Sequence, residues 1–367
     1  MKHFKTLLLV LVLAAIAGAI SYLESKRAAR NPAKGSIPIT FRLENGGAGQ
    51  GRAAEEIASP AGFINTDKIT VGELIGKKVV LVDFWTYSCI NCQRTTPYLN
   101  TWYEKYRDQG LEIIGMHTPE FEFEKKYDNV AAAVKKFGIK YPVVLDNNYA
   151  TWNAYGNRYW PRKYLIDIGG RIAYDHIGEG AYEETERKIQ DLLAERMAAL
   201  GMAEKIPQGV LAPVNAPTTD LAQIKSPETY FGARRNANFG NGTPGVIGLL
   251  SLAPPPDTQS NRLYLVGQWY IQNEYAEARG DGAKIIFRYQ AKDVYLVAGA
   301  EPAVKIRVLR DGAVLGAEAG SDVSRDGTAI IHENRLYKLI RGAGYGEHII
   351  EILIENAGLQ AFTFTFG

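Results

Sequence analysis

The sequence predicts an α/β domain followed by an all-β jelly-roll or sandwich domain, with a single signal or membrane segment ahead of both. Three observations support this organisation. The 367 residues exceed what one hydrophobic core usually serves. Apolar strand patterns alternate with helical patterns up to residue 200, whereas only short alternating runs occur beyond residue 226. We therefore assign residues 1–35 to the segment, 36–62 to a tether, 63–200 to the α/β domain, 201–225 to a linker and 226–367 to the β-domain.

The N-terminal segment is an apolar run over residues 7–20 that follows Lys2 and Lys5. Its length fits the apolar region of a signal peptide, and residues 17–19 offer a small-x-small cleavage site. Counted on to residue 23, the run reaches the minimum length of a membrane-spanning helix. Both alternatives predict an extracytoplasmic, periplasmic protein, which is either membrane-anchored or secreted after cleavage. An uncleaved anchor is slightly favoured.

The elements of the α/β domain follow in order from their periodicity. Val79–Trp85 is a mostly apolar, valine-rich run, which is typical of a central strand covered on both faces. Further strands are predicted over 111–117, 143–145, 164–168 and 171–176, and helical segments over 92–109, 129–137, 150–155 and 183–200. Gly169-Gly170 between the last two strands indicates a hairpin. Alternation followed by a hairpin predicts a mixed sheet with helices on both faces.

The chain changes character after residue 200. Prolines at 207, 213 and 217 interrupt any helical pattern and indicate a linker. Short strands are then predicted over 262–266, 284–289, 293–297, 304–309, 335–340, 348–354 and 361–366. Many short strands without a convincing helix favour a β-sandwich or jelly roll.

The overall composition is that of a globular protein that folds in water. Hydrophobic residues make up 46% and charged residues 22%, which excludes a disordered chain and a polytopic membrane protein. The net charge is only +2, and residues 1–62 hold the basic excess, with 8 Lys and Arg against 4 Asp and Glu. Neither domain offers the basic face that phosphate backbones require, so we expect no nucleic-acid partner.

The chain has two cysteines, Cys89 and Cys92, placed where the 79–85 strand gives way to a helix. The positive end of the helix dipole and its unpaired amides favour the thiolate form of the first cysteine. The second, one turn along, can resolve a mixed disulfide. A structural zinc site would need two further Cys or His ligands, and a structural disulfide usually closes a longer loop. We therefore expect a redox-active Cys89-Cys92 disulfide and no other cofactor or metal.

The residues around this pair resemble the thioredoxin family. Val82-Asp83-Phe84-Trp85 leads into the cysteines, and Pro97 follows them. The order HTPE (117–120), YPVVLD (141–146) and YWP (159–161) before YLID resembles the exported TlpA/ResA-like, redoxin branch. The segments WTYSCINCQR and LDNNYATWNAYGNRYWP are similar to the periplasmic C-terminal region of DipZ proteins. The segment SPETYFG at the start of the β-domain is similar to that region as well. The resemblance implies a thioredoxin-like fold followed by a domain similar to carbohydrate-binding modules.

The resemblance also implies roles for individual residues. Asp83 takes the buried-carboxylate position and would accept a proton from Cys92, although a strand-end cap is the alternative. Glu120 takes the acidic position that faces the cysteines, or else it is a solvated loop charge. Pro161 takes the cis-proline position, which turns the Trp160 backbone towards an extended substrate. The expected docking residues are Trp160, Tyr159, Trp85 and Tyr87.

The resemblance implies an extracytoplasmic thiol-disulfide oxidoreductase, a reductant or electron relay acting on exported protein disulfides or apocytochrome c. An oxidising compartment would keep Cys89 and Cys92 oxidised unless a donor reduces them. DipZ proteins carry a multi-span, CcdA-like domain ahead of this region, whereas one apolar segment precedes it here. The expected electron donor is therefore a separate membrane protein of the CcdA or DsbD kind.

Three alternatives stay open. Thr86-x-x-Cys89 is similar to the Thr-x-x-Cys motif of thiol-dependent peroxidases of the AhpC/TSA antioxidant class, although Val82 stands where those enzymes have proline. A redox-inactive binding module is a second alternative, which an intact cysteine pair argues against. In the β-domain, Trp269 and nearby tyrosines could stack on carbohydrate or could belong to the core.

Overall fold

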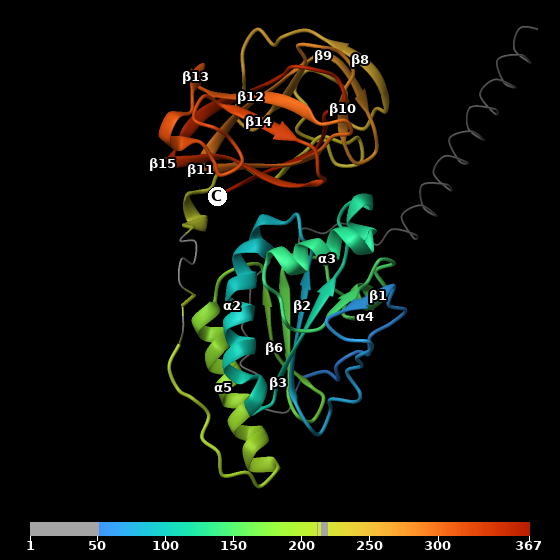
Figure 1. Ribbon diagram of the computed structural model, residues 1–367, viewed down its shortest axis with the longest axis vertical. Coiled ribbons are helices and arrows are strands. Elements are labelled where there is room, and N and C mark those ends of the chain that lie inside the picture. Colours follow the sequence, from blue (N-terminus) through green and yellow to red (C-terminus); the bar gives the residue numbers. More distant parts are fainter. Residues whose placement is uncertain (1–50, 211, 214–218) are drawn as a thin grey trace, which may run out of the picture. The chain divides into compact units, whose positions relative to one another are not determined.

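The computed structural model describes residues 51–210, 212–213 and 219–367, which belong to one compact unit, Gly46–Gly367 (Figure 1). The predicted signal or anchor segment, residues 1–35, lies outside the described residues. Within the described residues, no helix combines the length and apolar character that crossing a membrane requires.

A six-stranded mixed sheet forms the α/β domain. Its strands are β1 (Gly62–Ile64), β2 (Val79–Trp85), β3 (Leu111–His117), β4 (Val143–Leu145), β5 (Arg162–Ile166) and β6 (Ile172–Ile177). They lie in the order β1-β4-β3-β2-β5-β6, with β2, β3 and β4 parallel and β5 and β6 forming the predicted antiparallel hairpin. This is the thioredoxin-like arrangement that the sequence predicts.

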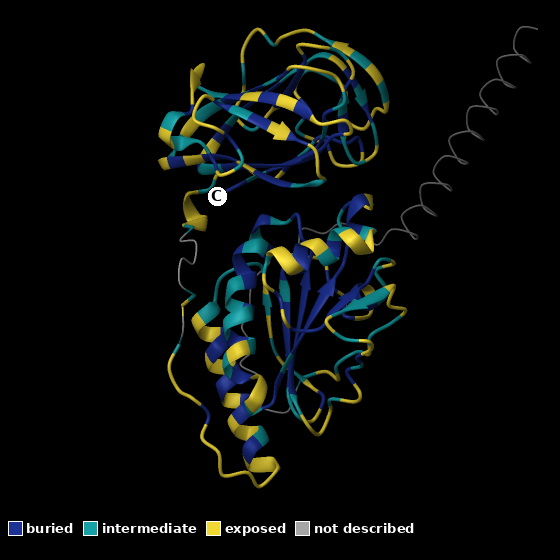
Figure 2. Ribbon diagram, viewed as in Figure 1, coloured by how far each residue is buried: buried dark blue, intermediate teal, exposed yellow. Residues whose placement is uncertain are grey.

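Helices cover both faces of this sheet. They are α2 (Ile90–Tyr106), α3 (Tyr127–Lys136), α4 (Ala150–Ala154) and α5 (Tyr182–Ala199). Because side chains alternate along a strand, Val79 and Leu81 of β2 pack in the core with α2 and α5, while Val80 and Val82 pack in the core with α4. Every residue of β2 is buried (Figure 2), so the central strand holds the following residues in fixed positions.

Part of the predicted tether lies against the α/β domain. Ala53 bridges Arg171, and the backbone amide of Ala54 donates to Gly170. Gly62 opens β1, which pairs with β4. Composition alone did not reveal these contacts, because backbone pairing at a sheet edge requires no apolar pattern.

Ten strands linked by hydrogen bonds form the β-domain. They are β7 (Thr229–Tyr230), β8 (Gly248–Leu252), β9 (Leu263–Ile271), β10 (Ala276–Ala278), β11 (Lys284–Gly299), β12 (Val304–Arg310), β13 (Ala313–Val314), β14 (Thr328–Ile331), β15 (Arg335–Ile354) and β16 (Gln360–Phe366). The strand pairings are antiparallel, and one large apolar core draws on nearly all of the strands. A large antiparallel domain is therefore confirmed.

Two pairs of predicted strands are each one long strand. The runs at 284–289 and 293–297 join in β11, and those at 335–340 and 348–354 join in β15. The polar and glycine residues between them mark irregularities in one ladder, with a register shift between Ala291 and Asp293, instead of chain reversals.

Apolar side chains join the two domains within this unit. Phe362 of β16 lies 5.1 and 4.8 Å from the rings of Phe121 and Phe123, measured between centroids. Leu336 of β15 belongs to the same core cluster as β2 and α2. The β-domain therefore contacts the loop after β3, which also carries Glu120.

Candidate active site

The cysteine pair lies at the start of α2. Cys89 is the N-cap residue, and its Sγ accepts a hydrogen bond from the Cys92 amide at 3.4 Å. Cys89 is partly exposed, whereas Cys92 is only 2% exposed, and both are free thiols. Burial raises the pKa of the Cys92 thiol well above its usual value, and the neighbouring Cys89 and Asp83 raise it further. The arrangement gives an accessible sulfur at a helix N-terminus and a buried sulfur that needs a proton acceptor.

Asp83 supplies a buried carboxylate close to Cys92. It lies on β2 with 2% exposure, and its Oδ1 has no hydrogen-bond partner among the described residues. Burial raises its pKa to about 7, opposed by the positive charge of Lys163. The strand-end cap that the sequence left open does not fit a carboxylate buried in the central strand.

Lys163 is a site residue that sequence reasoning missed. It pairs in register with Asp83 across β2 and β5, is 1% exposed, and donates from Nζ to the Gly178 carbonyl at 3.0 Å. Burial lowers its pKa, while Asp83 and Cys92 oppose that change. The predicted strand began at Tyr164, one residue too late to include this lysine. A lysine inside a buried strand would have signalled a charge partner.

The backbone of Trp160 faces the exposed cysteine. The Trp160–Pro161 peptide bond is cis, as the resemblance implied, and Cys89 Sγ lies 4.0 Å from the Trp160 carbonyl oxygen. The Trp160 indole donates to the Thr118 carbonyl at 2.9 Å and packs against Trp152. Trp160 is thus only partly exposed.

Two of the four expected docking residues are in the wrong place for docking. Tyr159 is 50% exposed, but Trp85 and Tyr87 are 2% and 5% exposed. Trp85 packs edge-on against His117, and the Tyr87 hydroxyl donates to the Asn334 carbonyl of the β-domain at 3.2 Å. Both lie in the buried strand and turn before Cys89, where aromatic rings fill the core.

Glu120 is held by the β-domain. Its Oε1 accepts hydrogen bonds from Arg235 Nη1 at 2.7 Å and from the Tyr230 hydroxyl at 2.8 Å, and its side chain is 8% exposed. A solvated loop charge would not show this burial. Glu120 and Cys89 line the same groove, so the acidic side chain does share a site with the exposed sulfur.

Glu124 is a second residue that the sequence did not single out. It is fully buried and accepts hydrogen bonds from the Ser88 hydroxyl at 2.6 Å and from the backbone amides of Glu120 and Phe121 at 2.6 and 3.0 Å. Burial and the charge of Glu120 raise its pKa to about 7. It ties the turn before Cys89 to the loop after β3.

Glu124→Gln is expected to destabilise the protein by about 1–3 kcal/mol, because an amide leaves some of these buried donors without an acceptor. The matched control is Glu122→Gln, whose side chain is 74% exposed and pairs with Lys125. That control should change the free energy of unfolding by less than about 0.5 kcal/mol. Equal shifts of the urea midpoint in both variants would contradict the assignment.

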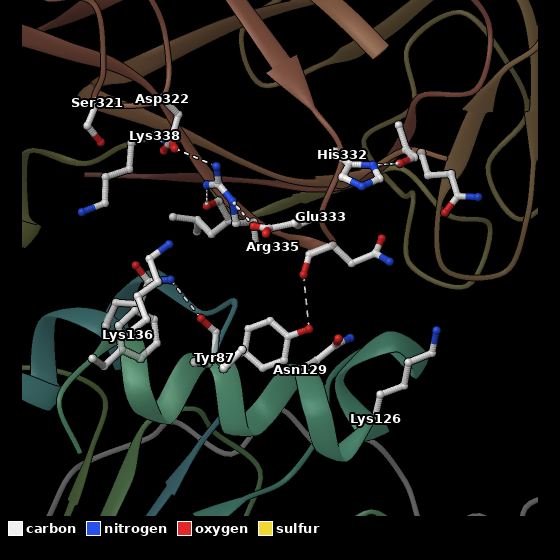
Figure 3. A pocket seen from close by; sticks show the side chains of 18 of the residues that line it. Tyr87, Lys126, Asn129, Lys136, Ser321, Asp322, His332, Glu333, Arg335 and Lys338 are labelled. Atoms are coloured by element: carbon white, nitrogen blue, oxygen red, sulfur yellow. Dashed lines mark hydrogen bonds and ion pairs between the residues drawn. The ribbon is translucent and has the colours of Figure 1, made fainter. Parts of the chain in front are cut away.

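A groove and a larger cavity are each lined by described residues of both domains. The groove at Cys89 has a volume of about 510 Å³. A larger cavity of about 870 Å³ contains neither cysteine, and Figure 3 shows Tyr87 and Asn129 on one side of it and His332, Glu333 and Arg335 on the other. Of these two hollows between described residues, the smaller groove is the one that reaches Cys89. No cluster of three or more potential metal ligands occurs in the described parts of the chain.

The aromatic residues proposed to stack on sugars do not form an exposed platform. Trp269 is fully buried in the β-domain core, and Tyr275 packs against Phe362. The Arg279 guanidinium covers Tyr270, with the Arg279 Cζ atom 5.4 Å from the centre of the Tyr270 ring. The core alternative is correct for Trp269, because its strand alternates its side chains between the core and the surface.

The chain matches two known families. Residues 64–193 match the family described as Redoxin, and residues 226–367 match the family described as Thioredoxin like C-terminal domain.

Curated relatives include Protein DipZ and two proteins named thiol-disulfide oxidoreductase. The chain is 39% identical to Protein DipZ of Mycobacterium tuberculosis over 319 residues, which is 86% of this chain and 43% of DipZ. It therefore spans less than half the length of that protein. It is 33% identical to the thiol-disulfide oxidoreductase ResA of Bacillus thuringiensis over 35% of this chain and 74% of ResA. It is 28% identical to the thiol-disulfide oxidoreductase YkuV of Bacillus subtilis over 38% of this chain and 93% of YkuV.

Proposed function

Because the chain belongs to the ResA-related thiol-disulfide oxidoreductases, we propose that Cys89 and Cys92 exchange electrons with disulfides of exported proteins. The observation that carries this proposal is the pairing of a partly exposed Cys89 sulfur at a helix N-terminus with a buried Cys92 beside Asp83. The redox-active group is the cysteine pair itself, and no other cofactor or metal takes part.

The reaction runs in two steps. The Cys89 thiolate attacks one sulfur of a substrate disulfide, so that a mixed disulfide forms and the other substrate sulfur leaves as a thiolate. Cys92 then gives its proton to Asp83 and attacks the Cys89 sulfur. The substrate's second thiolate leaves, the Cys89-Cys92 disulfide forms, and two electrons have passed to the substrate.

We assign the protein a reducing role outside the cytoplasm, where a membrane donor of the CcdA or DsbD kind would restore the dithiol. Exported proteins with disulfides, including apocytochrome c, are the proposed acceptors. The family names of the relatives support thiol-disulfide exchange over the peroxidase alternative. The Thr86 hydroxyl also fits that alternative poorly, because it is fully buried and lies 3.5 Å from His117 Nε2.

The reduction potential of the Cys89/Cys92 pair tests the direction of electron flow. Equilibration of residues 36–367 with glutathione or dithiothreitol should give a value near that of thioredoxin, about −270 mV. A value between about −120 and −180 mV, as in DsbA or protein disulfide isomerase, would reverse the proposal and make the protein an oxidase or isomerase.

A further inference from the structure

A second pair of buried charges lies close to the redox site. Arg94 of α2, two residues after Cys92, donates from Nη1 to Oε1 of Glu179 at 2.8 Å, and the two side chains are 4% and 8% exposed. We propose that this pair gives Lys163 a standing negative counter-charge, so that Lys163 stays protonated while Asp83 gains and loses its proton. The inference rests on the proposed function and concerns the second step of that reaction, in which Cys92 resolves the mixed disulfide.

The loop between β6 and α5 connects this pair to the cation of the redox site. Lys163 Nζ donates to the Gly178 carbonyl at 3.0 Å, and Glu179 is the next residue. Burial raises the pKa of Glu179, while the positive charges of Arg94 and Lys163 oppose that change. Burial lowers the pKa of Lys163, and the charge of Glu179 is among those that oppose the lowering. Charges of alternating sign therefore follow one another along four buried side chains, those of Asp83, Lys163, Glu179 and Arg94.

The charge opposite Lys163 across the sheet is lost during the reaction. In the resolution step Asp83 accepts the Cys92 proton and becomes neutral. A buried ammonium with no negative charge nearby tends to lose its own proton, because burial disfavours the charged form. The Glu179 carboxylate stands outside this proton transfer, and its guanidinium partner keeps its charge in proteins. Lys163 therefore has one negative charge beside it in both states of Asp83.

The other titratable groups that face Lys163 do not supply this charge. His176 lies in register with it on β6, and burial and the Lys163 charge lower the pKa of His176, which keeps the ring neutral. The Tyr182 ring of α5 has its centre 5.9 Å from Lys163 Nζ, and burial raises the pKa of the Tyr182 hydroxyl to about 12. The Cys92 thiol becomes negative only as its proton leaves. Among the described residues whose charges stabilise the Lys163 ammonium, Glu179 is thus the one that stays negative throughout.

Glu179 acts on the proton acceptor through Lys163. Burial raises the pKa of Asp83, and among the described residues Lys163 is the charged group that lowers it. A lysine that has lost its proton can no longer do so. Removal of the Glu179 carboxylate should therefore let the pKa of Asp83 rise, and resolution should then require a higher pH. Glu179 is a positioning residue in this scheme, because its effect on Asp83 passes through a second side chain.

Reduction of dithiobis(nitrobenzoate) by the full chain separates the two chemical steps. The prereduced protein attacks the reagent through Cys89 and releases one nitrothiobenzoate. Cys92 then attacks the Cys89 sulfur, the second nitrothiobenzoate leaves, and the Cys89-Cys92 disulfide forms. Rapid mixing between about pH 5 and pH 9, followed by absorbance, gives the rate of the second release as a function of pH and hence its midpoint.

Glu179→Gln is expected to move this midpoint upward by roughly 0.5–1 pH unit, in the direction expected for Lys163→Met. In a Lys163→Met background the same substitution should move it by less than about 0.2 pH unit, because no ammonium is left for Glu179 to stabilise. The matched control is Glu183→Gln on α5, since the Glu183 side chain is 66% exposed and pairs with Arg187. This control should leave the midpoint in place.

A double variant keeps the test valid if Glu179→Gln does not fold with Arg94 left unpaired. Replacing both members of a buried ion pair costs much less stability than removing one, so Arg94→Gln combined with Glu179→Gln should fold and show the same upward shift. An unchanged midpoint in a folded variant that lacks the Glu179 carboxylate would overturn the inference, and so would an equal shift in the Lys163→Met background. A failure of the proposed function looks different, because the unmodified protein would then release no second nitrothiobenzoate.

Discussion

Cys92→Ser is expected to stop turnover and to trap a covalent complex with the substrate. Cys89 remains partly exposed at the start of α2 and still attacks the disulfide. The variant lacks the buried thiol that would break the resulting bond, so the mixed disulfide persists. Turnover should fall by more than about a thousand-fold, as expected when a residue that takes part in covalent chemistry is removed. Non-reducing electrophoresis and mass spectrometry would detect the complex.

Cys89→Ser is the matched control for this experiment. It keeps the buried thiol, which is 2% exposed and has a strongly raised pKa, and so it should form no complex. Serine differs from cysteine by one atom, and both variants should keep the circular dichroism of the unmodified protein. Equal trapping by the two variants would show that the order of attack is wrong.

The α/β fold could be predicted because its signals are local. The bounds of β2, β3 and β4 follow from apolar runs between polar or glycine residues, and the prediction matches them residue for residue. The sequence-based prediction divided each of the long strands β11 and β15 into two. A glycine or charged residue inside a strand ladder gives the same local sequence pattern as one in a turn. Their continuity depends on pairing between segments far apart in the chain.

Site residues could be predicted where neighbours in the sequence are also neighbours in the site. The cysteine pair follows from its place between one strand and one helix, whereas the role of Asp83 was implied by the resemblance to thioredoxins. Lys163 reaches Asp83 through strand pairing, and Glu124 has the same local sequence signal as its exposed neighbour Glu122. That the β-domain binds Glu120 and forms a wall of the groove is a tertiary fact with no local signature.

Asp83→Asn is expected to stabilise the protein at alkaline pH while slowing resolution of the mixed disulfide. The folded-state pKa of Asp83 is about 7 against an ordinary value of 3.8, so the folded protein holds this proton more tightly than the unfolded chain. Stability due to this group is therefore full below about pH 4 and is lost as the pH rises towards 7. Three pKa units correspond to about 4 kcal/mol, which is the largest gain expected at pH 8.

Urea unfolding at pH 4 and pH 8 measures this gain, which should be close to zero at the lower pH. The rate of resolution, measured by rapid mixing, should lose its pH dependence near 7 because the proton acceptor is gone. Equal stabilisation at both pH values would mean that asparagine only packs better.

Lys163→Met is the control that separates charge from packing. The Lys163 cation lies opposite Asp83 and lowers the pKa of that carboxyl. Because the substitution removes this cation, the pKa of Asp83 should rise, and the pH dependence of resolution should move to higher pH. Arg162→Met alters the neighbouring residue, whose guanidinium pairs with Asp175 towards the surface, and should leave the profile in place. If the Lys163→Met and Arg162→Met profiles coincide, Asp83 does not accept the proton of Cys92. A shift confined to Lys163→Met would instead establish that the pair across β2 and β5 sets the pH at which the enzyme completes its reaction.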